Sequence, residues 1–131
     1  MHIHHLALRV RDFEKSLHFY QTLTELKIHT QFSANGGSIA YLQNASGETQ
    51  LELIGMPEGK TVKASGMFLC FGTEDIASAH ERAVLHGMNP SDIRQPEPDA
   101  RYFYVYDPGV FSRRRRHTRF VNAAGVHKSD F

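Results

Sequence analysis

His5 and Glu52 are the two residues whose types and positions best suit acid–base chemistry. Each lies in a short segment in which apolar and polar side chains alternate, and Glu52 stands between two leucines. Because successive residues of a strand point to opposite faces of a sheet, we expect both side chains on the polar faces of two strands. A carboxylate whose pKa is raised by partial burial can remove a proton next to a carbonyl, so Glu52 is the candidate general base. The alternative is a hydrogen-bonded polar pair that catalyses nothing.

A cationic side chain, Arg9, shares the predicted face of His5 because it lies four residues later in the same strand. A guanidinium group can anchor the carboxylate or phosphate of a ligand. The alternative is a structural salt bridge with Glu52 or Asp12, and the sequence leaves both open.

The remaining candidates are two histidines, an aromatic run and one cysteine. His2 and His4 would form a three-histidine cluster with His5, but His4 alternates to the other face of the strand, so we expect no cluster. The aromatic run at 102–106 is either core or a surface on which a flat ligand stacks. Cys70 lies in an apolar run, so we expect a buried reduced thiol without a nucleophilic role.

The size and composition indicate one compact domain. The chain has 131 residues, of which 40% are hydrophobic and 22% are charged, as is ordinary for a globular protein with a core. No apolar run approaches the length of a membrane span, and no signal peptide is recognisable. The single cysteine excludes an internal disulfide. These features lead us to expect a cytoplasmic protein without a membrane partner.

The charge is unevenly distributed. Residues 1–112 carry nine Lys and Arg against thirteen Asp and Glu, whereas residues 113–131 carry six against one. A run of arginines at 113–116 causes most of the excess. Such a run can bind nucleic acid through counterion release, but it lacks interleaved aromatic residues and the rest of the chain is acidic. We therefore expect a solvated basic tail without a nucleic-acid partner.

The chain contains an internal repeat with an offset of 63 residues. The pattern at 5–13 returns at 68–76, and Tyr41 is matched by Tyr104. Each copy is typical of a strand, a helix and three further strands. The predicted fold class is therefore α+β with two βαβββ modules. His5, however, is matched by Phe68.

The predicted boundaries follow from this repeat. Module one covers about 1–56 and module two about 64–112, together forming a single domain, with an exposed loop at 95–99. One more strand is expected after Gly109, where the arginine run stands instead, so the last strand is atypical. Residues 113–131 are interpreted as a basic tail, either native or the product of a frame change.

Several spaced motifs resemble the vicinal oxygen chelate superfamily, which includes glyoxalase I, bleomycin-resistance proteins and extradiol dioxygenases. The motifs are HLALRVRDF followed by SLHFYQTL, then QLEL, and later YVYDPG. The resemblance implies that the two modules form a curved mixed sheet, shaped as a cup, and that the protein is a homodimer. It also implies a divalent metal ion, namely Zn²⁺, Ni²⁺, Mn²⁺ or Fe²⁺, held by a His and a Glu from each module.

The resemblance assigns roles to individual residues. His5 and Glu52 match the first two metal ligands, whereas Phe68 and a position near Arg113 match the other two, and neither of these residues can ligate a cation. Arg9 matches an arginine that contacts the anionic part of the substrate. The predicted substrate-binding residues on this basis are Arg9, Phe68, Cys70 and Phe103.

Two functions from different classes follow from these assignments. The first is a glyoxalase-like, metal-dependent lyase or isomerase that acts on a small carbonyl substrate, as a lactoylglutathione lyase does. The second is a non-catalytic protein that binds a small molecule, like the bleomycin-resistance proteins, and whose metal site is degenerate. A dioxygenase ranks last because its Fe²⁺ needs two histidines and one carboxylate.

Overall fold

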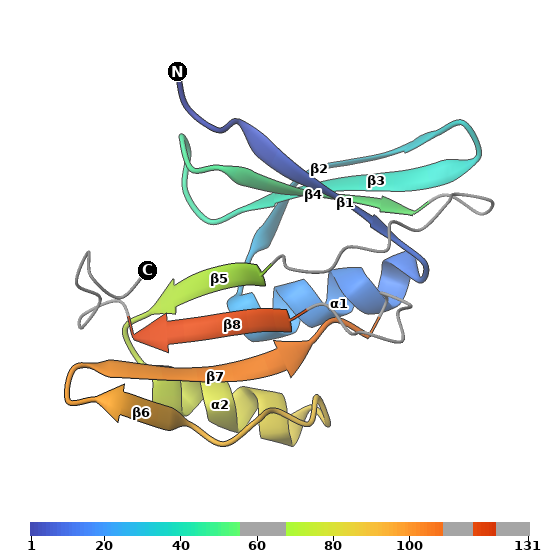
Figure 1. The fold of residues 1–131 in the computed structure, drawn as a ribbon. Coiled ribbons are helices and arrows are strands. Elements are labelled where there is room, and N and C mark those ends of the chain that lie inside the picture. Colours follow the sequence, from blue (N-terminus) through green and yellow to red (C-terminus); the bar gives the residue numbers. More distant parts are fainter. Residues whose placement is uncertain (56–67, 109–116, 123–131) are drawn as a thin grey trace. The chain divides into compact units, whose positions relative to one another are not determined.

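The computed structural model describes residues 1–55, 68–108 and 117–122 (Figure 1). They belong to two compact units, of which the first contains residues 1–55 and Pro108 and the second contains residues 68–107 and 117–122. In the described residues, each unit has one helix and one four-stranded sheet, in the order strand, helix and three strands. The prediction of an α+β fold with two βαβββ modules is confirmed.

The first unit places its first and last strands side by side. Its sheet has the order β1-β4-β3-β2, in which β1 and β4 are parallel and the other neighbours are antiparallel. The sheet is therefore mixed. Its elements are β1 (His5–Val10), α1 (Phe13–Thr24), β2 (Lys27–Ala34), β3 (Gly37–Gln43) and β4 (Gln50–Gly55).

Helix α1 begins at an N-cap and buries its apolar side. The backbone N–H of Lys15 donates to the carboxylate of Asp12 over 3.1 Å, which satisfies one of the free N–H groups at the start of the helix. The buried side chains of the helix and of the sheet form the core of this unit, and the largest are Phe19, Tyr20, Leu8, Leu23, Leu42 and Leu53. Because the strands alternate, their polar residues occupy the opposite face of the sheet.

The hairpin between β2 and β3 turns at an Asn-Gly pair. Asn35 has a φ of 51° and Gly36 a φ of 76°, and these two residue types adopt such left-handed conformations most readily. The turn sets the pairing of β2 with β3.

The second unit has the same order of elements. Its sheet runs β5-β8-β7-β6, with β5 and β8 parallel and the other neighbours antiparallel. Its elements are β5 (Phe68–Thr73), α2 (Ile76–Leu85), β6 (Arg94–Glu97), β7 (Ala100–Tyr106) and β8 (His117–Asn122). Helix α2 is capped by Asp75, whose carboxylate accepts from the backbone N–H of Ser78 over 3.0 Å.

Two elements differ from the predicted boundaries. Strand β6 takes up part of the predicted loop at 95–99, and it is an exposed edge strand, where Pro96 is tolerated because an edge residue needs no ladder N–H. Strand β8 lies inside the segment 113–131 that was interpreted as a tail. The arginine run obscured the sequence pattern of this strand. It lies between β5 and β7 and pairs with both, so its own backbone groups have partners on both sides.

Neither helix in the described part of the chain has the length and apolar character that spanning a bilayer requires.

Candidate functional site

The first sheet brings His5 and Glu52 together on the face away from α1. Strands β1 and β4 pair in parallel, with Ala7 opposite Glu52. This register places Nε2 of His5 3.2 Å from Oε2 of Glu52. Glu52 is only 7% exposed, whereas the His5 side chain is 37% exposed. A nearly buried carboxylate therefore meets an imidazole that solvent and ligands can reach.

A tyrosine that the sequence analysis did not assign to the site, Tyr41, completes this group. It lies directly opposite Glu52 in the antiparallel pair of β3 and β4. Burial raises the pKa of Tyr41, and so do the hydrogen bond to Glu52 and its negative charge. The His5 ring meets the Tyr41 ring edge-on, with centroids 5.6 Å apart. The alternation of β3 predicts which face of the sheet Tyr41 occupies. Its position opposite Glu52 depends on the register between β3 and β4, which the sequence does not give.

Phe32 of β2 extends this group of rings. Its ring stacks on that of Tyr41 at a centroid distance of 6.4 Å and an angle of 23°. Phe32 is 44% exposed, so an apolar surface lies next to the polar pair. Stacked and edge-on ring contacts are the favoured aromatic geometries.

His4 lies beside His5, although alternation predicted it on the other face. Nδ1 of His4 is 2.8 Å from Nδ1 of His5, and the rings are nearly perpendicular. Strand β1 begins at His5, so the period of two does not extend back to His4. One of the two nitrogens must carry the proton that is shared between them. The ring of His2 is farther away, with its centroid 6.4 Å from that of His4.

Arg9 is exposed at the far end of the same strand. Among the described residues, no ion pair joins it to Glu52 or Asp12. Glu52 is paired with His5 instead, and Asp12 is paired with Lys15 at 3.8 Å. In the described residues, the structural salt bridge of Arg9 with Glu52 or Asp12 is therefore not formed.

The second sheet has the same register but different residue types. Glu52 pairs with Ala7 and Tyr41, and the equivalent position, paired with Cys70 and Tyr104, is Arg119. The arginine at the fourth ligand position is therefore residue 119 and not the predicted Arg113, which lies outside the described residues. The cause is an offset of 67 residues between the starts of β4 and β8, against 63 between those of β1 and β5.

The other predicted site residues lie in this second unit. Phe68 opens β5, and Cys70, predicted to be buried, is exposed two positions later. Phe103 is fully buried, and its ring meets His80 of α2 edge-on with centroids 5.1 Å apart. A ligand cannot reach a core ring, so we leave Phe103 out of the proposed site.

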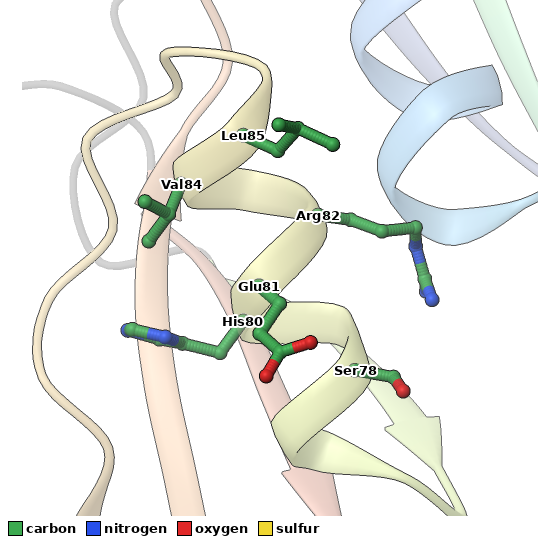
Figure 2. Close-up of a pocket in the computed structure, with 6 residues that line it drawn as sticks. All are labelled: Ser78, His80, Glu81, Arg82, Val84 and Leu85. Atoms are coloured by element: carbon green, nitrogen blue, oxygen red, sulfur yellow. The ribbon is translucent and has the colours of Figure 1, made fainter.

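A shallow hollow lies on the surface of α2 (Figure 2). The His80 ring, one of its polar groups, makes a hydrogen bond through Nε2 to the carbonyl of Ser91 over 2.8 Å. The apolar part is formed by Val84 and Leu85, which are 58% and 81% exposed. The hollow is lined by Ser78, His80, Glu81, Arg82, Val84 and Leu85.

The family of the chain follows from comparison with known proteins. Residues 2–111 match the family model described as the glyoxalase/bleomycin resistance protein/dioxygenase superfamily. The chain belongs to this superfamily. No curated protein matches it.

Solved structures of the superfamily share the fold of the chain. Glyoxalase I of Leishmania major, described as trypanothione-dependent, is 19% identical, with a TM-score of 0.73, covering 95% of this chain and 88% of its own. The antibiotic-binding protein TnmS3 from Streptomyces sp. CB03234 is 18% identical, with a TM-score of 0.71 and coverages of 93% and 95%. The fosfomycin resistance protein FosX of Listeria monocytogenes, in complex with Mn(II) and sulfate, is 15% identical, with a TM-score of 0.66 and coverages of 91% and 89%. Identities this low establish the fold alone.

Superfamily members often use a divalent metal ion, and the first sheet offers a partial fit for one. Imidazole nitrogen and carboxylate oxygen are ligand types for Zn²⁺, Ni²⁺, Mn²⁺ and Fe²⁺. Two ligands that each lie about 2.0–2.2 Å from one ion are about 3 Å apart when they are neighbours, and the His5 and Glu52 atoms are 3.2 Å apart. Within residues 1–55, 68–108 and 117–122, however, no three His, Cys, Asp or Glu side chains gather in this way. In that part of the chain, the first sheet therefore offers two candidate ligands, His5 and Glu52.

Proposed function

We propose that this superfamily member is a glyoxalase-like, metal-dependent lyase or isomerase that acts on a small carbonyl substrate. The observation that supports this most directly is the contact of 3.2 Å between Nε2 of His5 and Oε2 of Glu52 on the face of the sheet away from its helix. The two atoms are close enough to act on one ligand. Glu52 is also the most deeply buried acid of the described first unit.

Glu52 would act as the base of this reaction. Its carboxylate would take a proton from the carbon next to the carbonyl and return it to the neighbouring carbon. Low exposure favours this role because few water molecules compete for the carboxylate. Arg9, exposed on the same strand as His5, would anchor the anionic end of the substrate with charge-assisted hydrogen bonds.

His5 and Glu52 would hold the metal ion. When bound, such an ion supplies positive charge that stabilises the negative charge developing on the substrate oxygens. Water or the substrate would complete the coordination, because the described residues offer two ligands at this face.

The second candidate is a non-catalytic protein that binds a small aromatic molecule. The stacked rings of Phe32 and Tyr41 favour it, because the exposed Phe32 ring offers a face to a flat ligand. The residue types Phe68 and Arg119 in the second sheet also favour it, since neither can ligate a cation. Under this function the chain binds its ligand without a metal ion.

A homodimer and a cytoplasmic location stay part of the proposal. Two copies of such a domain often associate in this superfamily, and sedimentation of the purified chain measures the association directly.

Metal content decides between the two candidates. The purified chain is loaded with Ni²⁺, Zn²⁺, Mn²⁺ or Fe²⁺ and dialysed, and its bound metal is measured by elemental analysis. We expect near-stoichiometric metal in the native chain and loss in His5→Ala and Glu52→Gln. His29→Ala and Glu14→Gln are matched controls, because both residues are exposed and lie outside the site. A native chain without metal under every loading would reject the metalloenzyme and leave the binding protein.

A further inference from the structure

One row of paired positions crosses all four strands of the first sheet, from a cation at one edge to an exposed ring at the other. The row consists of Arg9, Ile54, Ile39 and Phe32. We propose that it binds a carboxylate with a flat apolar tail, whose charge lies at Arg9 and whose tail extends over the isoleucines as far as Phe32. This ligand class rests on the proposed function, in which Arg9 anchors the anionic end of the substrate.

The row follows from the register of the sheet. Arg9 of β1 pairs with Ile54 of β4. Ile54 pairs with Ile39 of β3, and Ile39 pairs with Phe32 of β2. Because neighbouring strands lie about 4.8 Å apart, these three intervals extend over about 14 Å. A ligand that covers the whole row must therefore lie across the strands.

The first half of the row faces away from the helix. The positions just before Arg9 and Ile54 are the paired leucines Leu8 and Leu53, which are buried in the core. Since successive residues of a strand point to opposite faces, Arg9 and Ile54 point away from that core. Arg9 is exposed and Ile54 is partly exposed. This end of the row is therefore accessible to a ligand.

Ring contacts place the outer end of the row on the same face as the acid–base pair. Phe32 stacks on Tyr41, and the Tyr41 ring meets that of His5. Glu52 lies two residues before Ile54 in β4, which is about 6.6 Å along a strand. A ligand that lies along the row would therefore pass beside Glu52, the base of the proposed function.

Charge selects the ligand at one end of the row. In the described part of the chain, Glu52 is paired with His5 and Asp12 is paired with Lys15, and no ion pair engages Arg9. A guanidinium group can form two parallel hydrogen bonds with a carboxylate. A ligand carboxylate would therefore supply the counter-charge that no side chain supplies within those residues.

Apolar surface selects the rest of the ligand. Ile54 and Ile39 are partly exposed, and Phe32 is 44% exposed, so three apolar side chains in succession meet solvent. Covering them with an apolar tail removes their surface from water, and an aromatic ring placed over Phe32 adds a favourable ring contact. A polar tail would gain neither contribution.

The corresponding row of the second sheet has a different order. Gly72 takes the position of Arg9, and the arginine of this row is Arg94 on the edge strand β6, directly opposite Tyr102. The cation and the ring are thus at neighbouring positions, whereas two apolar positions separate them in the first sheet. Because Arg94 is exposed like Arg9, Arg94→Gln is a matched control for Arg9→Gln.

The test is a calorimetric titration of the purified full chain with three probes, namely para-phenylbenzoate, benzoate and para-phenylbenzamide. The first probe has both the charge and the long tail, the second lacks the outer ring, and the third lacks the charge. We expect the native chain to bind para-phenylbenzoate more tightly than it binds either of the others. Equal affinity for benzoate or for the amide would overturn the proposal without the use of any variant.

Two variants locate the charge and the tail of the ligand. Arg9→Gln should weaken the binding of both carboxylates by about 10–100-fold, the usual effect of losing a hydrogen bond to a charged group, and leave the amide unchanged. Phe32→Ala should weaken both two-ring probes by about 2–10-fold and leave benzoate unchanged. Native affinities in either variant would overturn the proposed row.

The control variants change exposed residues of the second unit. Arg94→Gln and Leu85→Ala, whose native side chain is 81% exposed, should leave all three affinities unchanged. Loss of affinity in either control would overturn the proposal, because the ligand would then lie on the second unit. Thermal melting followed by circular dichroism checks that each variant is folded, and the comparison of the three probes in the native chain holds in any case.

The outcomes separate this ligand class from the proposed function, since binding of the probes requires neither a metal ion nor turnover. Selective binding that depends on Arg9 and Phe32, in a chain that takes up no metal, would reject the metalloenzyme and keep the row as a ligand site. Bound metal together with probe affinities that ignore both substitutions would reject the row and keep the metal site. A chain that binds neither metal nor any probe would overturn both.

Discussion

The two sheets of this protein share one backbone register and carry different chemistry on it. In the first sheet the position between Ala7 and Tyr41 is Glu52, and in the second the position between Cys70 and Tyr104 is Arg119. The residue that opens the first strand is His5 in one sheet and Phe68 in the other. A repeated fold thus preserves which positions are neighbours, while the residue types at those positions decide whether a cation can bind.

The cores of the two units differ in a complementary way. In the first unit the large buried rings, Phe19 and Tyr20, come from the helix and face a sheet that contributes Ala40. In the second unit the helix contributes Ala79 and Ala83, and the large ring is Phe103 of the sheet. Ala40 and Phe103 are equivalent in the repeat. The space between helix and sheet is filled mainly by helix side chains in the first unit and by a sheet side chain in the second. Both arrangements keep the interior close-packed.

The largest expected effect is on the second core. Phe103→Ala removes a fully buried ring and should lower the free energy of unfolding by about 3–5 kcal/mol, as measured by urea denaturation. Phe32→Ala removes a half-exposed ring and should cost about 0.5 kcal/mol or less. Equal effects of the two substitutions would contradict the assignment of Phe103 to the core.

The second prediction gives the first sheet the residue type of the second. Glu52→Arg replaces a proposed metal ligand with a cation at the position equivalent to Arg119. We expect metal affinity to fall by more than about 100-fold, measured by calorimetry with Zn²⁺. The control Glu48→Arg changes an exposed acid in the loop before β4 and should leave the affinity near its native value. Retained binding in Glu52→Arg would show that the ion sits elsewhere.

The third prediction concerns the ends of the paired strands. Gly55 pairs with Val10, and a Cβ added there would lie 2.5 Å from Cβ of Phe13. The equivalent position in the second sheet, opposite Thr73, is Asn122, so that unit accepts a Cβ. Gly55→Ala should therefore destabilise the protein by about 1–3 kcal/mol, measured by urea denaturation. An unchanged unfolding midpoint would mean that Phe13, at the start of α1, can move away from the added Cβ without a cost in free energy.

The smallest expected effect is at the helix cap of the second unit. The backbone N–H of Ser78, and then its hydroxyl, hold the pKa of Asp75 below its usual value of 3.8. Because the pKa is lower in the folded state, the ionised Asp75 stabilises the fold above pH 3.8, and this contribution is lost as the pH falls through the folded-state pKa. Asp75→Asn should melt at a slightly lower temperature than the native chain at neutral pH.

The difference in melting temperature between Asp75→Asn and the native chain should shrink as the pH is lowered below 3.8. Thermal melts between neutral and acidic pH measure it. Asp12→Asn is the matched cap variant of the first unit. A difference that stays constant across the acidic range would show that the charge of Asp75 contributes nothing to stability.

The repeat predicted the two modules, and the helix of each begins at an aspartate N-cap, Asp12 or Asp75. These features could be read from the sequence because alternation, capping and turn chemistry are local. The position of β8 could not be read in this way. Its place between β5 and β7 is decided by the pairing of distant strands, and the arginines before it obscured its pattern.

For the candidate site, too, the local features could be predicted from the sequence and the contacts between strands could not. The sequence by itself determined that His5 and Glu52 lie on polar faces of two strands and that Phe68 takes the place of His5 in the second copy of the repeat. Only the tertiary structure decided that Nε2 of His5 reaches the Glu52 carboxylate, and that Tyr41 lies opposite Glu52 in the neighbouring strand. The physical reason is that local alternation fixes the face of a residue, whereas its neighbours on that face depend on the register between strands that are distant in the chain.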